Sequence, residues 1–145
     1  MKDQKAKKEL VCRKRIVVRF SEVDPMGVVW HGNYAKYLED GREAFGLEFG
    51  IGYLDFNKNG LFAPIVRLEC DYRRSLRYGD SAVVETRYEF TESSKLVLHY
   101  TIENETNGEV IARGKSVQVF TDESGKLFLA YPPFYEQWLR SHGYI

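Results

Sequence analysis

The sequence has little cysteine and no long apolar run. Its two cysteines, Cys12 and Cys70, are too few for the disulfide framework that stabilises many small secreted domains. We therefore expect two reduced thiols and a cytoplasmic protein. No apolar run approaches the ~18 residues that a transmembrane helix needs, and the Lys-rich residues 1–9 lack the apolar core of a secretory signal. The sequence thus predicts neither a membrane span nor export.

An excess of charge of one sign is also missing. Lys and Arg number 21 and Asp and Glu number 21, so the chain has no global attraction to nucleic acid or to an anionic membrane. The three histidines and two cysteines are scattered without the spacing of a metal site, and GxSxG, P-loop and GxGxxG motifs are absent. We expect no metal, no cofactor and no nucleic-acid partner, so that any anionic ligand must meet a local basic patch.

What is present is the composition of one ordinary globular domain. The 145 residues are 43% hydrophobic and 29% charged. A chain of this length buries roughly 70% of the surface that its unfolded state exposes. We expect a single domain over residues 1–145, in which residues 1–9 form a charged, flexible leader.

The first half of the sequence changes from a strand pattern to a helix pattern. The β-rich residues 10–20 predict a strand, and the composition of residues 24–27 is that of a type I turn. Helical spacing then predicts a helix with Asn33 as its N-cap and Gly46 at its end. Its predicted buried stripe is Tyr34, Tyr37, Leu38, Gly41 and Phe45. Since glycine costs a helix about 1 kcal/mol relative to alanine, we interpret Gly41 as a point of close approach by a strand.

The second half of the sequence favours strands. Residues 50–64 predict a long loop anchored by Tyr53, Phe56 and Phe62. Strand patterns follow, the last three spaced like an antiparallel meander; they cover residues 65–73, 81–90, 96–104 and 110–121, with a turn at 77–80. A short helix is expected to begin at Pro132-Pro133. One long helix and one antiparallel sheet make an α+β domain.

One segment combines chemistry with geometry, namely Asp24-Pro25-Met26-Gly27-Val28-Val29-Trp30-His31-Gly32-Asn33-Tyr34. It places a carboxylate across a tight turn from the start of a helix, so that both can act on one carbonyl group. The carboxylate supplies a base or a nucleophile, and the helix supplies backbone N–H donors for a developing oxyanion. On the residues alone, simpler interpretations stay open, because Asp before Pro commonly opens a turn and a histidine at a helix start commonly packs.

Two stretches of the sequence resemble one known family. The first contains Phe20, Asp24, Gly27-Val28-Val29-Trp30, His31, Asn33-Tyr34 and Leu38-Glu39, and the second covers residues 72–80. Both resemble the hotdog-fold thioesterases of the 4-hydroxybenzoyl-CoA thioesterase-like family, from which the sequence departs at Ser75, where many relatives have proline. The resemblance implies a hotdog fold, an antiparallel sheet wrapped around a long central helix. It also implies hydrolysis of acyl-CoA thioesters at a site between two subunits.

The same resemblance implies roles for individual residues. It makes Asp24 the catalytic carboxylate, as the nucleophile or as the base that activates water. It makes the backbone N–H groups near His31 the polarisers of the thioester carbonyl, and we take His31 as the second catalytic residue. The expected acyl-binding residues are Gly27, Val28, Val29, Trp30, Gly32 and Tyr34, although core packing explains the apolar members of this set equally well.

A group of basic residues is the candidate site for the phosphates of coenzyme A. Arginine presents a fork of donors to phosphate oxygens, and lysine supplies a point charge. The alternative is the polar outer face of a sheet. The group comprises Arg73, Arg74 and Arg77, together with Lys95, Arg113 and Lys115. Glu39 lies about 12 Å along a helix from His31, too far to share a carbonyl group with it, so we expect Glu39 to form surface ion pairs.

Assembly is expected as well, because long edge strands favour pairing with a second copy. We expect a homodimer or a tetramer made of two dimers, acting on acyl-CoA or on an acyl-carrier protein. Two rival functions stay open. One is an acyl-CoA or acyl-carrier-protein binding module with little turnover, which would not depend on Asp24. The other is a hydratase or dehydratase, for which Asp24 and His31 could supply the base and the acid.

Overall fold

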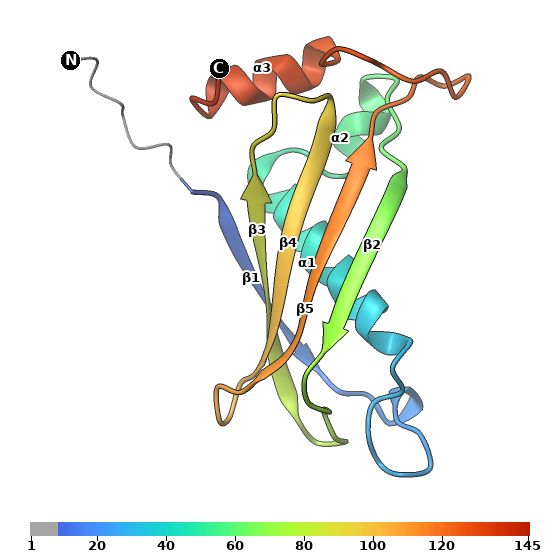
Figure 1. Cartoon of the computed structure of the whole chain (residues 1–145), viewed down its shortest axis with the longest axis vertical. Helices are drawn as coiled ribbons and strands as arrows, with labels where there is room; N and C mark the ends of the chain where they lie inside the picture. Colours follow the sequence, from blue (N-terminus) through green and yellow to red (C-terminus); the bar gives the residue numbers. More distant parts are fainter. Residues whose placement is uncertain (1–8) are drawn as a thin grey trace, which may run out of the picture.

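Five strands form one antiparallel sheet in the order β1-β3-β4-β5-β2 (Figure 1). The computed structural model describes residues 9–145. Its strands are β1 (Val11–Val17), β2 (Ile65–Tyr72), β3 (Ser81–Glu89), β4 (Lys95–Asn104) and β5 (Val110–Val119). Its helices are α1 (Asn33–Phe49), α2 (Tyr53–Lys58) and α3 (Pro133–Ser141), with a 3₁₀ turn at Phe20–Glu22. Because α1 runs along one face of this sheet, the predicted α+β architecture is confirmed.

The start of the described chain is attached to the sheet. Residues 1–8 of the expected leader lie outside the described residues. The Glu9 carboxylate pairs with the guanidinium of Arg87 on β3, and the next side chain, Leu10, is buried. Glu9 and Leu10, the first two described residues, are therefore both in contact with the fold.

The core lies between α1 and the inner face of the sheet. Successive side chains of a strand point to opposite faces, and β3 follows this rule along its length. Its buried side chains are Ala82, Val84, Thr86 and Tyr88. The predicted stripe of α1 is confirmed, since every member is buried: Tyr34, Tyr37, Leu38, Gly41 and Phe45.

Both predicted ends of α1 were wrong. The N-cap position is Gly32, while the Asn33 side chain donates from Nδ2 to the Glu22 carbonyl at 2.8 Å and so ties the helix to the preceding turn. At the other end, the helix continues through Gly46 and stops at Gly50, where φ is +75°. Glycine is needed at 46 for another reason, because a Cβ there would lie 2.7 Å from the Cα of Gly52.

Two further segments differ from the prediction. The first strand ends at Val17, and Phe20 lies in the 3₁₀ turn with 75% of its surface exposed. The loop predicted at residues 50–64 contains the helix α2, whose residue Phe56 is buried as expected. Tyr53 is 70% exposed, however, so it does not anchor this segment. A six-residue helix has too few turns for its periodicity to be recognised.

The helix predicted after Pro132-Pro133 is confirmed as α3, which lies across one end of the sheet (Figure 1). Tyr135, Trp138 and Leu139 are buried beneath it. The Tyr135 hydroxyl lies 2.5 Å from that of Tyr88, and the Trp138 indole N–H donates to the carbonyl of Phe49 at 2.7 Å. The helix therefore closes the end of the core where α1 finishes.

The two thiols lie far apart in this fold. Cys12 is on β1 and Cys70 is on β2, the strands at opposite edges of the sheet, and both are free. Burial raises the pKa of the Cys12 thiol to about 12. Of the helices within residues 9–145, none is long and apolar enough to cross a membrane.

Candidate active site

Asp24 lies on a small hairpin before α1. Val23 and Val29 form an antiparallel bridge, and the N–H of Asp24 donates to the carbonyl of Val28 at 2.8 Å. The predicted turn is present, since the N–H of Gly27 donates to the carbonyl of Asp24 at 2.9 Å. Gly27 has a φ of +76°, which glycine adopts at little cost. Local hydrogen bonds thus determine where the Asp24 side chain lies.

The carboxylate of Asp24 is itself oriented by the turn. Its Oδ1 accepts a hydrogen bond from the N–H of Met26 at 2.9 Å. This contact occupies one oxygen with a main-chain donor, and among the described residues no hydrogen bond to the second oxygen is found. The side chain is half-buried, so it is held by the loop and still reachable from the adjoining cavity.

Two backbone amides just before α1, those of His31 and Gly32, donate no backbone hydrogen bond within the described residues. The amides on either side, at residues 29–30 and 33–34, donate to backbone carbonyls. Unpaired amides at the N-terminus of a helix carry partial positive charge and favour a negatively charged group.

A cavity of about 280 Å³ brings the hairpin and the helix start together. Seven of the predicted site residues line it: Asp24, Val28, Val29, His31, Tyr34, Arg73 and Arg74. Its other lining residues are Met26, Tyr72 and Ser75. Of these, Tyr72 was not predicted as a site residue, although it lies two residues after Cys70 and so shares one face of β2 with it.

Four predicted site residues do not line this cavity. Trp30 is 52% exposed, and its ring lies against His31 with the centroids 4.9 Å apart. Gly32 is covered by the same indole, because a Cβ there would overlap the Trp30 ring at 2.0 Å. Gly27 forms the turn described above. Arg77 lies in the predicted turn at residues 77–80, where its backbone N–H donates to Asp80 Oδ2 at 2.8 Å.

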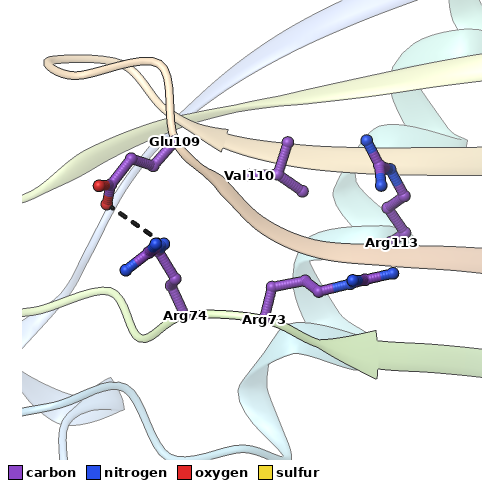
Figure 2. Close-up of a pocket in the computed structure, with 5 residues that line it drawn as sticks. All are labelled: Arg73, Arg74, Glu109, Val110 and Arg113. Carbon is purple, nitrogen blue, oxygen red and sulfur yellow. Dashed lines mark ion pairs between the residues drawn. The ribbon is translucent and has the colours of Figure 1, made fainter.

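A second, larger cavity of about 550 Å³ adjoins the first, because Arg73 and Arg74 line both. Figure 2 shows its lining, with Arg73 and Arg74 from the segment after β2 and Arg113 from β5. The only acidic side chain among its lining residues is Glu109, whose Oε2 lies 3.7 Å from Nε of Arg74. The N–H groups of Arg73 and Arg74 both donate to the carbonyl of Ile111, which holds this segment against β5.

The remaining basic candidates line neither cavity. Lys95 pairs with Val119, at the opposite end of β5 from Arg113. Lys115 lies opposite Glu69 on β2 and His99 on β4. The prediction for Glu39 is confirmed, because its carboxylate pairs with Arg42 one turn further along α1.

The two phenols of the smaller cavity stay protonated at neutral pH. Burial raises the pKa of Tyr34, whose hydroxyl oxygen accepts the N–H of Leu76 at 3.0 Å. Partial burial also raises the pKa of Tyr72. The Tyr72 hydroxyl donates to the carbonyl of His31 at 3.1 Å. In the described part of the chain, no group of three or more His, Cys, Asp or Glu side chains is placed to hold a metal ion.

Comparison with known proteins identifies the family. Residues 18–139 match the thioesterase-like superfamily. The chain belongs to this superfamily. The matched range contains the Asp24 hairpin, α1 and the lining of both cavities. Membership assigns the protein, at the level of the family, to the thioester hydrolases, and it confirms the hotdog fold.

Individual members of the superfamily agree with this assignment. "Putative acyl-CoA thioesterase YneP" of Bacillus subtilis is 34% identical over 128 residues, which are 88% of this chain and 92% of that protein. The DHNA-CoA thioesterase of Staphylococcus aureus is 29% identical with a TM-score of 0.77, over 93% of this chain and 96% of that one. The 4-hydroxybenzoyl-CoA thioesterase of Pseudomonas sp. strain CBS-3 shares the fold at 19% identity, with a TM-score of 0.76 over 90% and 97% of the two chains.

Proposed function

We propose that this protein hydrolyses an acyl-CoA thioester to a free acid and coenzyme A. The observation that carries the proposal is the shared cavity of Asp24 and His31, which continues into a cavity lined by arginines. A carboxylate near unpaired amides suits the thioester group, and arginines suit the phosphates of coenzyme A. The names of the relatives support the same substrate class.

In the proposed mechanism, the thioester carbonyl lies between Asp24 and the start of α1. Asp24 either attacks the carbonyl carbon, expelling the thiolate and leaving an anhydride that water cleaves, or it takes a proton from a water molecule that attacks instead. In both routes the carbonyl oxygen becomes negative and accepts hydrogen bonds from the N–H groups of His31 and Gly32. One such donor is typically worth about 10²–10³ in rate.

The rest of the substrate follows the two cavities. The acyl group lies against Val28, Val29 and Tyr34 in the smaller cavity. Gly27 and Trp30 act from outside it, through the turn and through contact with His31. The phosphates lie in the larger cavity against Arg73, Arg74 and Arg113, whose guanidinium groups donate to phosphate oxygens. Arg77, next to the hairpin, is placed to attract the anionic substrate at longer range.

We also propose a homodimer, with a tetramer as a further step. Among the described strands, the edge strand β2 pairs only with β5, and it carries large exposed apolar side chains, namely Val66, Leu68 and Tyr72. Such an edge is completed by pairing with the same strand of a second copy. Because Tyr72 also lines the smaller cavity, the partner would then border the site.

The two cysteines support a proposal about the compartment. Two free thiols on separate strands fit a reducing cytoplasm.

The proposal is tested by measuring thiol release from acetyl-, hexanoyl-, palmitoyl-, benzoyl- and 4-hydroxybenzoyl-CoA. Asp24→Asn keeps an oxygen that can accept the N–H of Met26, so the turn survives while the negative charge is lost. We expect kcat/KM to fall by at least ~10²-fold. The matched control is Asp40→Asn, an exposed carboxylate on α1, which should retain full activity.

The other outcomes separate the rival functions. Equal rates for the wild type and Asp24→Asn would reject the catalytic role of Asp24. Tight binding of acyl-CoA without turnover in either protein would favour a binding module for acyl-CoA or an acyl-carrier protein. Asp24-dependent addition of water to an enoyl-CoA, without thiol release, would favour a hydratase.

A further inference from the structure

The indole ring of Trp30 lies directly over Gly32, just before α1. A Cβ at Gly32 would lie 2.0 Å from Cζ3, 2.3 Å from Cη2 and 2.7 Å from Cε3 of that ring. Real Cβ atoms do not come so close to other atoms, so no residue with a side chain fits at position 32 while the indole keeps its place. The ring therefore occupies the space that a side chain at Gly32 would need.

The backbone of Gly32 does not itself require glycine. Its φ of −66° and ψ of −21° lie in the right-handed helical region, which residues with side chains adopt freely. Gly27 and Gly50 differ in this respect, because their positive φ values favour glycine whatever surrounds them. Contact with the indole is therefore what explains the missing side chain at Gly32.

The indole also bears on the place of the His31 ring. The two ring centroids lie 4.9 Å apart, and the imidazole meets the ring of Tyr72 at a centroid distance of 6.5 Å. Among residues 9–145, the imidazole makes no hydrogen bond or ion pair, so these ring contacts are what hold it. Since His31 lines the smaller cavity and Trp30 does not, the indole supports the cavity wall from outside.

Trp30 is firmly attached to its own surroundings. Its N–H donates to the carbonyl of Glu22 at 2.9 Å, and its carbonyl accepts the N–H of Asn33 at 2.9 Å. The peptide that joins Trp30 to His31 also carries the unpaired N–H of His31. A change in the place of His31 therefore disturbs a backbone donor of the proposed site as well as its ring.

We infer that Trp30, seated on Gly32, is a positioning residue for thioester hydrolysis, which holds His31 in the wall of the smaller cavity. This inference rests on the proposed function and adds to it the reason why residue 32 has no side chain. The indole is 52% exposed, so it adds little to the core. Its displacement is therefore expected to slow the chemical step more than it weakens the fold.

The first test is Gly32→Ala, which displaces the indole without removing it. The half-exposed ring can turn into solvent, and alanine suits the helical backbone, so the midpoint of urea unfolding should not fall. We expect kcat for acyl-CoA to fall about tenfold, because a misplacement of about 1 Å can cost 10²-fold, and KM to change less than twofold. Gly52→Ala is the matched control and should keep the wild-type kcat, because Gly52 is the N-cap of α2 and a Cβ there would meet no atom nearer than 3.4 Å.

A double-mutant cycle shows whether Gly32 acts through the indole. Trp30→Ala should lower kcat by about the same factor as Gly32→Ala. In the Trp30→Ala protein, Gly32→Ala should have no further effect, because the ring that it would displace is gone. Tyr53→Ala, which removes an exposed ring from α2, should match the wild type. Losses that add in the double variant would overturn the inference.

Proton NMR gives a readout that does not depend on activity. The chain has three histidines, and both Gly32→Ala and Trp30→Ala should shift the ring-proton resonances of His31 while those of His99 stay in place. Unchanged His31 resonances in Gly32→Ala, or an unchanged kcat despite a shift, would overturn the inference. If the resonances shift as expected but Asp24→Asn keeps full activity, the proposed function fails instead, so the two failures are distinguishable.

Discussion

A methyl group added to the Cα of Gly41 on α1 would lie 2.6 Å from Cγ1 of Val84 on β3. The same methyl group would lie 2.7 Å from Oγ1 of Thr86, which is also buried. The helix thus meets the sheet through its backbone at this point. The interpretation of Gly41 as a point of close approach by a strand is thus confirmed. The missing side chain allows the backbone of α1 to lie this near to β3.

We predict that Gly41→Ala destabilises the protein although alanine favours helices. The gain in helix propensity is about 1 kcal/mol, whereas forcing a methyl group into a filled core costs about 1–3 kcal/mol. With contacts this short we expect the upper end of that cost, and a net loss of about 1–2 kcal/mol in the free energy of unfolding. Urea unfolding measures it, with the exposed Lys36→Ala as the control for propensity. A more stable Gly41→Ala protein would contradict the packing argument.

The arginine cavity leads to a prediction about which part of the substrate is bound there. Arg113→Gln removes one charge from the cavity and leaves Arg73 and Arg74 in place. A hydrogen bond to a charged group is worth about 1.5–3 kcal/mol, so KM for an acyl-CoA should rise about tenfold or more. KM for the corresponding acyl-pantetheine thioester, which lacks the phosphates, should not change.

Two further variants make this measurement specific. Glu109→Gln removes the acidic side chain beside Arg74, so KM for acyl-CoA should fall. Arg140→Gln is the matched control, because Arg140 lies on α3 and pairs with Glu136 there. A rise in KM for both thioesters in Arg113→Gln would place the acyl group, and not the phosphates, against this arginine.

The parts of the site that are close in sequence were predictable, and those joined by the sheet were less so. Asp24 and His31 flank one turn, and local signals sufficed to place a carboxylate near a helix start. Arg113 joins Arg73 and Arg74 only because β2 pairs with β5, with Asp71 opposite Arg113. This pairing of strands that are not consecutive cannot be read from spacing. For the same reason, Lys95 was grouped with residues that lie at the other end of its neighbour strand.

The predictions for the two ends of α1 were wrong for a related reason. By helix propensity, Gly46 was a reasonable residue at which to end the helix. In the structure, its lack of a side chain instead allows Gly52, which follows the helix, to pack against it. Asn33 was a reasonable cap, but its amide bonds to the Glu22 carbonyl. In both cases a tertiary contact used the residue that a local rule assigned to the end of the helix.

We predict that stability falls at alkaline pH because buried phenols must ionise when the chain unfolds. The Tyr100 hydroxyl lies 2.6 Å from the Ser116 hydroxyl, and burial raises the pKa of Tyr100 from 10.0 to about 12. The neutral phenol is favoured in the folded state, so its contribution is complete below pH 10 and is lost between pH 10 and about 12. Burial likewise raises the pKa of Tyr88, in the same direction.

Urea unfolding from pH 8 to 11.5 measures this effect. One proton adds a slope of at most about 1.4 kcal/mol per pH unit. Tyr100→Phe should therefore show a shallower decline above pH 10 than the wild type, whereas Tyr53→Phe, which removes an exposed phenol, should decline as the wild type does. Identical slopes for Tyr100→Phe and the wild type would mean that Tyr100 does not titrate with unfolding.

Gly27 and Gly108 allow the effect of backbone strain on stability to be separated from its effect on the position of Asp24. Gly27 and Gly108 have nearly equal φ values of +76° and +71°, and a Cβ at either would meet nothing within 4 Å. Alanine should therefore cost the same backbone strain at both, about 1–2 kcal/mol, in the free energy of unfolding. Gly27 lies in the turn that holds Asp24, whereas Gly108 lies in the turn between β4 and β5. We expect only Gly27→Ala to lower kcat for acyl-CoA, by tenfold or more because displacement of a reacting group by about 1 Å can cost 10²-fold. Equal loss of activity in the two variants would show that the strain acts through overall stability and not through the position of Asp24.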